Sequence, residues 1–272
     1  MNISNILEEN LMKVVQLKDV SFRRWNRLIL NKINWHVQKG EHWVLLGLNG
    51  SGKTSLLKLI TGYEWASGGE ITVLNERFGQ TNIHELRKTI GWVSSSLDER
   101  FAARASDTTL EVVLSGRHAS VGLYEDMTDE DKEAALQFLR LLKMENYKDS
   151  AFHTLSQGEK RRTMIARALM SEPKILILDE PCNGLDVYIR EQLLETIEGI
   201  MKLEDGPTIL YVTHHLEEVL PSVTNALLLR SGKIIAQGPK KGILTEPYLS
   251  DCFQLPVNIQ WQKGRPWLAI KN

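Results

Sequence analysis

Cysteine is scarce in this chain of 272 residues, and two classes of protein are thereby excluded. The two cysteines, Cys182 and Cys252, are too few for a disulfide framework or for a four-ligand zinc site. Because nothing in the cysteine pattern requires an oxidising compartment, a reducing cytoplasm is the simplest expected location.

Long apolar runs are missing as well. The densest ones, at residues 43–46 and 175–178, have the length of a strand, whereas a helix that spans a membrane needs roughly 20 apolar residues. The N-terminal segment MNISNILEENLMK has no basic region followed by an apolar one, so a secretory signal is not expected. Direct insertion into a membrane is therefore not predicted.

Neither sign of charge is in excess. Lys and Arg number 33 and Asp and Glu number 34, which leaves a formal net charge of −1. This balance provides no long-range attraction to nucleic acid or anionic lipid, so no nucleic-acid partner is predicted. The remaining composition, 42% hydrophobic and 25% charged residues, is typical of a globular chain with one large domain or a core with one inserted subdomain.

The periodicity of the apolar residues predicts an α/β chain. Period-2 alternation indicates antiparallel strands at residues 14–24 and 28–38, and an apolar run indicates a buried strand at 41–46. Helical spacing follows at 53–61. Farther along, the pattern predicts helices at 128–143, 157–170 and 186–203, strands at 175–178 and 208–212, and a strand pair at 225–238 around Ser231-Gly232.

These elements predict one domain over residues 1–240. Its core is a mixed sheet with an N-terminal antiparallel β subdomain, and an all-helical subdomain is inserted at about 96–168. Residues 241–272 contain Pro247, Pro256 and Pro266 and have no strong period, so an irregular C-terminal extension is predicted.

A glycine-rich segment joins the buried strand to the first helix. Residues 47–54, GLNGSGKT, match the phosphate-loop pattern G-x-x-x-x-G-K-[ST] in the strand-to-helix context that the pattern requires. Backbone N–H groups of such a loop surround phosphates, the Lys53 ammonium can bind the β- and γ-phosphates, and the Thr54 hydroxyl can bind Mg²⁺. A chance glycine-rich turn is the weaker alternative, because both flanking elements are predicted. ATP binding is expected at Gly47, Asn49, Gly50, Ser51, Gly52, Lys53, Thr54 and Ser55.

Two acids close the predicted strand of residues 175–178. Asp179 and Glu180 stand at its carboxyl end, where open α/β sheets bind their ligands. Asp179 is suited to bind Mg²⁺, and Glu180 to accept a proton from an attacking water. A solvated acid pair that only caps the next helix is the less favoured alternative.

Three further segments resemble the motifs of one family, the ATP-binding cassette (ABC) ATPases. Residues 155–159, LSQGE, are similar to the family signature LSGGQ, residues 183–186, NGLD, to its D-loop, and residues 212–214, VTH, to its switch-histidine segment. Together with the phosphate loop and the acid pair, their order and spacing agree with the family across about 14–240. The resemblance implies a P-loop NTPase core and an enzyme that hydrolyses ATP.

The resemblance also implies a head-to-tail homodimer or pseudo-dimer with two ATP molecules at its interface. Each ATP would lie between the phosphate loop of one subunit and the signature of the other, and Asp186 would shape that site. Ser156 with Glu159, and likewise Asp186, also fit as ordinary helix N-caps, and both roles can hold at once. The signature residues implied for this shared site are Ser156, Gln157, Gly158 and Glu159.

The resemblance makes Glu180 and His214 the catalytic pair. His214 would contact the γ-phosphate and orient the attacking water. The neighbouring His215 is the less favoured choice, because the alignment of the motif points to His214.

Two positions depart from the family pattern. The family usually has a glutamine in its Q-loop that contacts the metal, and this chain has Ser94-Ser95-Ser96 there instead. The position of the missing glutamine is assigned to Ser95, with Ser96 as the alternative. The aromatic side chain that usually stacks on adenine falls on Arg24, with Trp25 beside it. Both side chains can cover a purine, and Trp25 is favoured over Arg24.

The resemblance implies the ATPase subunit of a transporter. Such a subunit works with separate integral membrane subunits, associates peripherally with the cell membrane through them, and uses ATP and Mg²⁺. The absence of a fused membrane domain favours a bacterial importer arrangement. An ABC ATPase for another assembly, such as iron–sulfur cluster formation, is the alternative, and a module that binds ATP without hydrolysing it is disfavoured because Glu180 and His214 are both present.

Overall fold

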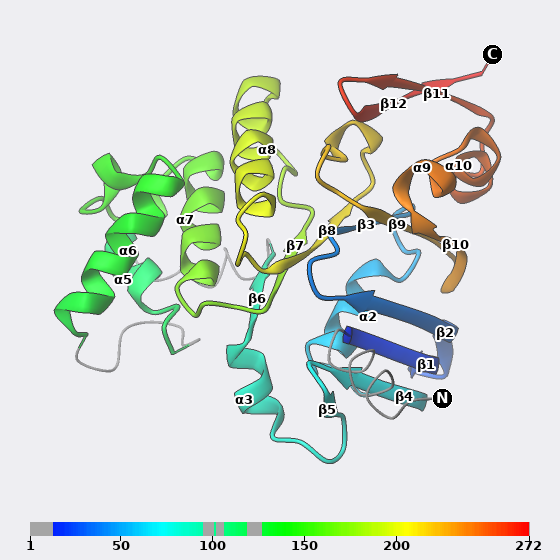
Figure 1. Ribbon diagram of the computed structural model, residues 1–272, viewed down its shortest axis with the longest axis horizontal. Helices are drawn as coiled ribbons and strands as arrows, with labels where there is room; N and C mark the ends of the chain where they lie inside the picture. The colour runs from blue at the N-terminus through cyan, green and yellow to red at the C-terminus, as the bar shows by residue number, and fades with distance from the viewer. Residues whose placement is uncertain (1–12, 95–100, 102–105, 119–126, 272) are drawn as a thin grey trace. The chain divides into compact units, whose positions relative to one another are not determined.

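The computed structural model describes residues 13–94, 101, 106–118 and 127–271 (Figure 1). The chain divides into two compact units. One contains the residues up to Leu86 together with those from Thr208 onward, and the other runs from Arg87 to Pro207. The division falls within the helix α3 (Ile83–Lys88) on one side and just before β8 (Thr208–Thr213) on the other.

The first unit begins with an antiparallel sheet, as predicted. Its strands are β1 (Lys13–Arg24), β2 (Arg27–Gln38), β4 (Gly68–Val73) and β5 (Glu76–Arg77), in the order β2-β1-β4-β5. The turn between β1 and β2 consists of Trp25 and Asn26, whose φ angles of 48° and 60° are those of a type I′ turn. This turn has the twist that two adjacent antiparallel strands require.

Parallel strands form the second sheet of this unit. β3 (Trp43–Leu46) pairs in parallel with β8 and with β9 (Asn225–Arg230), and β10 (Lys233–Pro239) returns antiparallel to β9 around the predicted Ser231-Gly232 turn. All four residues of β3 and all six of β8 are buried, because strands in the middle of such a sheet are covered on both faces. The helix α2 (Lys53–Ile60) follows β3 and buries Leu56, Leu57, Leu59 and Ile60.

The prediction of an irregular C-terminal extension is wrong. The chain continues through α9 (Lys240–Ile243), α10 (Glu246–Phe253), and an antiparallel pair, β11 (Val257–Gln262) with β12 (Arg265–Ile270). The three prolines occupy positions that regular structure tolerates. Pro247 lies in the first turn of α10, Pro256 lies just before β11, and Pro266 lies in a two-stranded pair in which each strand has a free edge.

The second unit combines a parallel strand pair with helices. β6 (Ile90–Val93) pairs with β7 (Ile175–Asp179), and α8 (Val187–Met201) follows β7. The helices α5 (Thr109–Leu114), α6 (Asp129–Leu141) and α7 (Gln157–Leu169) pack against one another, side by side in Figure 1. The predicted helices are thus present, and the exact limits of the inserted subdomain stay a prediction.

Local capping explains where these helices begin. Thr128 caps α6 and forms a capping box with Asp131, and Thr108 with Glu111 repeats the arrangement at α5.

Within the described ranges, no helix combines the length and the apolar character that crossing a membrane would take.

Candidate active site

The glycine-rich loop connects the end of β3 to the start of α2. Gly47 follows β3, and a Cβ atom there would lie 2.3 Å from the Leu229 carbonyl oxygen of β9, so only glycine fits. Gly50 and Gly52 have φ angles of 77° and 111°, in the left-handed region that favours glycine. The loop therefore has the backbone conformation that the motif predicts.

Lys53 closes the loop from inside. Its side chain is buried, and its Nζ donates hydrogen bonds to the carbonyl oxygens of Gly47 at 2.8 Å and Leu48 at 3.3 Å. The buried Ser51 Oγ has no hydrogen-bond partner among the described residues, whereas Thr54 is exposed at the first turn of α2. A buried ammonium and an unsatisfied hydroxyl beside a helix N-terminus are complementary to an anion.

The loop is also fixed from outside, by the β9–β10 turn. Gly232 N donates to the Ser51 carbonyl oxygen at 2.9 Å, and Asn31 N of β2 donates to the Gly232 carbonyl oxygen at 2.8 Å. A Cβ atom on Gly232 would lie 2.1 Å from the Ile29 carbonyl oxygen. The β9–β10 turn, itself bonded to β2, therefore supports the loop from a distant part of the chain.

His214 lies at the same sheet edge as the loop. In the parallel pairing of β3 with β8, Leu46 is the partner of Thr213, so Gly47 and His214 follow at equivalent positions. The rings of His214 and His215 are 4.2 Å apart between centroids. His215 Nδ1 lies 3.5 Å from the Glu217 carboxylate, which gives this ring a partner in its own segment.

A buried carboxyl group, which the sequence did not predict, lies four residues after His214. Glu218 accepts hydrogen bonds from the hydroxyls of Thr213 at 2.7 Å and Tyr211 at 3.1 Å, and His215 N donates to Thr213 Oγ1 at 3.0 Å. Burial raises the pKa of the Glu218 carboxyl, and the two hydroxyl donors offset only part of that rise. No sequence pattern identified this residue, because an acid in a short polar stretch is usually solvent-exposed.

The acid pair belongs to the second unit. Asp179 ends β7 and Glu180 follows it, and both are partly exposed. Glu180 has a φ angle of 50°, a conformation that is costly for a residue with a side chain and is typically kept at functional positions. In the pairing of β6 with β7, Val93 is the partner of Leu178, so the buried Ser94 and Asp179 follow at equivalent positions. Ser95 and Ser96 lie outside the described residues.

The signature segment is a helix N-terminus, as predicted. Ser156 caps α7, with its backbone N and its Oγ both donating to the Glu159 carboxylate at 2.8 and 2.7 Å. Burial raises the pKa of Glu159, but the hydrogen bonds from Ser156 and Tyr147 outweigh it and leave the pKa lowered. A Cβ atom on Gly158 would lie 2.4 Å from Ile189 Cγ2, so glycine here lets α7 approach α8 closely.

Asp186 caps α8, which confirms the N-cap half of its predicted role. Its carboxylate accepts a hydrogen bond from Ile189 N at 3.0 Å. The two residues that follow, Val187 and Tyr188, are 68% and 70% exposed, which is unusual for apolar side chains. The start of α8 thus presents an acid and two apolar groups to the surroundings of this unit.

Arg24 and Trp25 lie at the β1–β2 turn of the first unit. Both are exposed, and Trp25 is 91% exposed. Which of the two would cover a purine stays a prediction.

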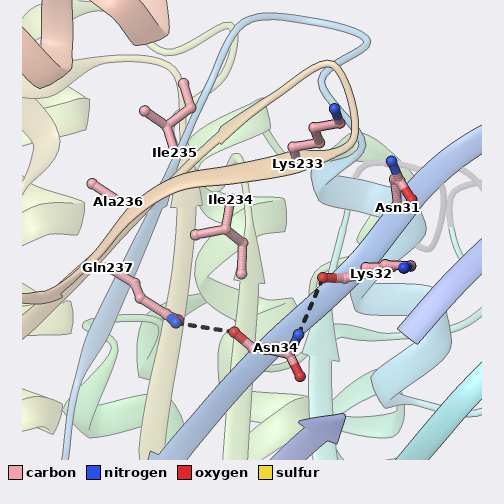
Figure 2. Close-up of a pocket in the computed structure, with 8 residues that line it drawn as sticks. All are labelled: Asn31, Lys32, Asn34, Lys233, Ile234, Ile235, Ala236 and Gln237. Carbon is pink, nitrogen blue, oxygen red and sulfur yellow. Dashed lines mark hydrogen bonds between the residues drawn. The ribbon is translucent and has the colours of Figure 1, made fainter. Parts of the chain in front are cut away.

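A separate hollow of about 550 Å³ lies between β2 and β10 (Figure 2). Two lysines, Lys32 and Lys233, line it together with Asn34 and Gln237. Gln237 Nε2 donates to the Asn34 carbonyl oxygen at 3.0 Å, which joins the edge strand of the parallel sheet to the antiparallel sheet.

The donor groups available to a metal are few. Within the part of the chain that the structure describes, no three His, Cys, Asp or Glu side chains gather in a way that could bind a metal ion. Magnesium usually needs only one or two protein oxygens when substrate phosphates supply further ligands. Each unit contains one candidate oxygen ligand of this kind, the Thr54 hydroxyl in the first unit and the Asp179 carboxylate in the second.

Comparisons with known proteins agree with the motifs. A family model described as ABC transporter matches residues 30–183. The chain is 46% identical to the uncharacterized ABC transporter ATP-binding protein YlmA of Bacillus subtilis (strain 168), over 94% of this chain and 97% of that protein. It is 34% identical to the zinc uptake system ATP-binding protein ZurA of Listeria innocua serovar 6a, over 83% and 86% of the respective chains. A dimeric post-hydrolysis structure of the ATP-binding cassette MJ0796 with ADP and Pi gives a TM-score of 0.70 at 25% identity, covering 83% of this chain and 98% of that one.

Proposed function

The chain belongs to the ABC transporter family, and we propose that two copies of it close around ATP to drive transport through separate membrane subunits. It is an ATP-binding, ATP-hydrolysing subunit with a P-loop NTPase fold. One observation carries the proposal most directly. The loop of residues 47–54, with Lys53 buried inside it, shares a sheet edge with His214. Such an edge binds a triphosphate and presents a polar side chain to its terminal phosphate.

Binding starts at the loop. Backbone N–H groups of residues 50–54 and the Lys53 ammonium bind the β- and γ-phosphates, while the loop carbonyls that Lys53 contacts keep its side chain inside the loop. The unsatisfied Ser51 hydroxyl is a further donor to the nucleotide. Trp25 covers the adenine, with Arg24 as the alternative.

Thr54 and Asp179 are the residues that would bind Mg²⁺, and Ser95 is a third candidate in place of the usual glutamine. When bound, the ion neutralises charge that develops on the phosphates. The chemistry of the acid pair follows from its position at the carboxyl end of β7. Glu180 accepts a proton from the attacking water, ADP is the leaving group, and His214 donates a hydrogen bond to the γ-phosphate.

The second copy supplies the rest of each site. The capped N-terminus of α7, with Ser156, Gln157, Gly158 and Glu159, binds the γ-phosphate held by the partner, since a helix N-terminus favours an anion. Asp186 and the exposed Val187 and Tyr188 contact the partner beside it. The dimeric state of the related cassette MJ0796 supports this arrangement.

The closing of the two copies around ATP is transmitted to membrane subunits. We place the chain at the cell membrane through these partners, in an importer arrangement, and the similarity to the zinc uptake subunit ZurA supports import. The relatives named above favour transport over the iron–sulfur alternative.

The test is turnover in the variant Glu180→Gln, with Glu195→Gln as a matched control. Glu195 is an exposed carboxylate on α8 of the same unit. We expect Glu180→Gln to lose at least 100-fold in ATPase rate and to form a dimer with ATP on a sizing column, because binding remains while the base is lost. Glu195→Gln should behave as wild type. Normal turnover in Glu180→Gln would contradict the proposal.

A second experiment tests the partners. The chain is captured from solubilised bacterial membranes with and without ATP, and the co-purified proteins are identified. Integral membrane proteins are expected. A scaffold without membrane-spanning segments would instead support the iron–sulfur alternative.

A further inference from the structure

We propose that Arg265, in the C-terminal strand pair, is a positioning residue for ATP hydrolysis that acts on His214 through the backbone of the residues that follow it. This inference rests on the proposed function of His214. It concerns the switch segment, defined as residues 214–221, and the tail, defined as residues 240–271.

Two cations of the tail bind backbone carbonyls of the switch segment. The Arg265 guanidinium donates to the Glu217 carbonyl oxygen through both Nε, at 2.9 Å, and Nη2. The buried Lys240 donates through Nζ to the carbonyl oxygens of Leu220, at 2.9 Å, and Pro221, at 2.8 Å. Three of the eight carbonyl groups of the switch segment are therefore bound by charged side chains of the tail, and charge-assisted bonds of this kind are the stronger ones.

The other side of the switch segment is anchored to β8. Glu218 accepts from the hydroxyls of Tyr211 and Thr213, and Thr213 accepts from His215 N. Along the chain, His214 therefore lies between Thr213, which bonds to Glu218, and Glu217, whose carbonyl oxygen accepts from Arg265. Loss of either bond lets the backbone that carries the imidazole shift, and a shift of about 1 Å can cost a large factor in rate.

The tail is also attached to the strands β3 and β9, next to the phosphate loop. The buried Cys252 thiol of α10 lies 4.0 Å from the Leu46 carbonyl oxygen of β3 and 3.9 Å from that of Leu229 in β9, and burial raises its pKa to about 11, so it stays a neutral packing group. Arg230 of β9 bonds to Asp251 of α10. The tail therefore contacts both the strand that leads into the phosphate loop and the switch segment.

The strand pair orients the guanidinium. Arg265 Cζ lies 5.7 Å from the centroid of the Trp267 ring, a cation–π distance, and Lys271 Nζ bonds to Glu246 of α10 at 2.8 Å. β12 packs along the 3₁₀ helix η3 (Leu216–Glu218) that contains the Glu217 carbonyl. Because the bonds of Arg265 to the Glu217 carbonyl hold the switch segment, its removal should affect the chemical step more than ATP binding.

Steady-state kinetics of Arg265→Ala, Arg265→Lys and the control Gln260→Ala test the inference. Gln260 is exposed on the neighbouring strand. We expect Arg265→Ala to lower kcat about tenfold with KM within twofold of wild type, Arg265→Lys to recover part of the loss through its remaining donor, and Gln260→Ala to match wild type. If Arg265→Ala does not fold, Arg265→Lys alone is compared with wild type. Its kcat should then be lowered by a smaller factor, again with KM nearly unchanged.

A double-mutant cycle with His214→Ala separates positioning from general stability. If Arg265 acts through His214, Arg265→Ala causes no further loss of kcat once His214 is absent, whereas an effect on stability alone would add in full. Unchanged kcat in Arg265→Ala, or a loss that adds to that of His214→Ala, would overturn the inference and leave the proposed function intact. A wild-type chain without turnover would instead contradict the proposed function.

Discussion

The Lys53 ammonium lies 2.8 Å from the Gly47 carbonyl oxygen, so the last residues of the phosphate loop bond back to its first. The hydrogen bond thus joins the end of the loop to its start. The same side chain that can bind phosphate therefore also helps to keep the loop in shape. A buried ammonium is costly unless it is bonded, and the loop carbonyls provide those bonds.

Replacement of Lys53 tests that double role. We expect Lys53→Ala to weaken ATP binding at least tenfold, about 1.4 kcal/mol, because both the charge and the closure of the loop are lost. Lys58→Ala, near the end of the same helix, is the matched control and should bind normally. Titration with a fluorescent ATP analogue measures both. Equal affinities of the two variants would contradict the role given to Lys53.

Gly47 is expected to tolerate no side chain. The 2.3 Å approach of a Cβ atom to the Leu229 carbonyl oxygen requires β3 and β9 to separate, so Gly47→Ala should lower the free energy of unfolding by about 1–3 kcal/mol. Gly199→Ala is the control, because nothing lies within 4 Å of its Cβ position in α8 and alanine favours a helix by about 1 kcal/mol. Urea denaturation should move the two variants in opposite directions. An equal change in the free energy of unfolding of both variants would mean that β3 and β9 can separate without loss of stability.

The features that the sequence predicts correctly depend on neighbours in the chain. The capping box of Ser156 involves a residue three positions later, and the phosphate loop lies within eight consecutive residues. Period-2 alternation likewise located β1 and β2, because burial on one face of a sheet repeats every second residue.

The missed features depend on contacts between distant residues. Arg265 and the Glu217 carbonyl are 48 positions apart, and a backbone carbonyl leaves no trace in the sequence of its partner. The regular structure of the tail was missed because Pro247, Pro256 and Pro266 usually indicate irregular chain, whereas here each occupies a position without an N–H requirement. Glu218 was missed because its burial follows only from the packing of η3 onto β8.

Glu218 should make stability depend on pH in a definite direction. Its folded-state pKa is raised above the ordinary value of 4.5, so the folded chain binds the proton more tightly than the unfolded chain does. Its contribution to stability is then complete below pH 4.5 and is lost as pH rises through the raised pKa. Glu218→Gln does not titrate, so its free energy of unfolding relative to wild type should increase from pH 4.5 upward.

Urea denaturation of both chains at several pH values measures this difference, in which titrating groups remote from Glu218 cancel. Glu195→Gln, which replaces an exposed carboxylate of α8, is measured alongside as the matched control. A pH-independent difference for Glu218→Gln would show that burial of the carboxyl has no effect on its protonation.

Asp186 allows its two roles to be separated by one pair of variants. Asparagine caps a helix about as well as aspartate, so Asp186→Asn should keep the stability of α8, while Asp186→Ala should lose about 1 kcal/mol with the hydrogen bond to Ile189 N. If Asp186 also shapes the site of the partner copy, both variants lower the ATPase rate, because both lack the charge. If it is only a cap, the rate of Asp186→Asn equals that of wild type, and the role in the shared site is refuted.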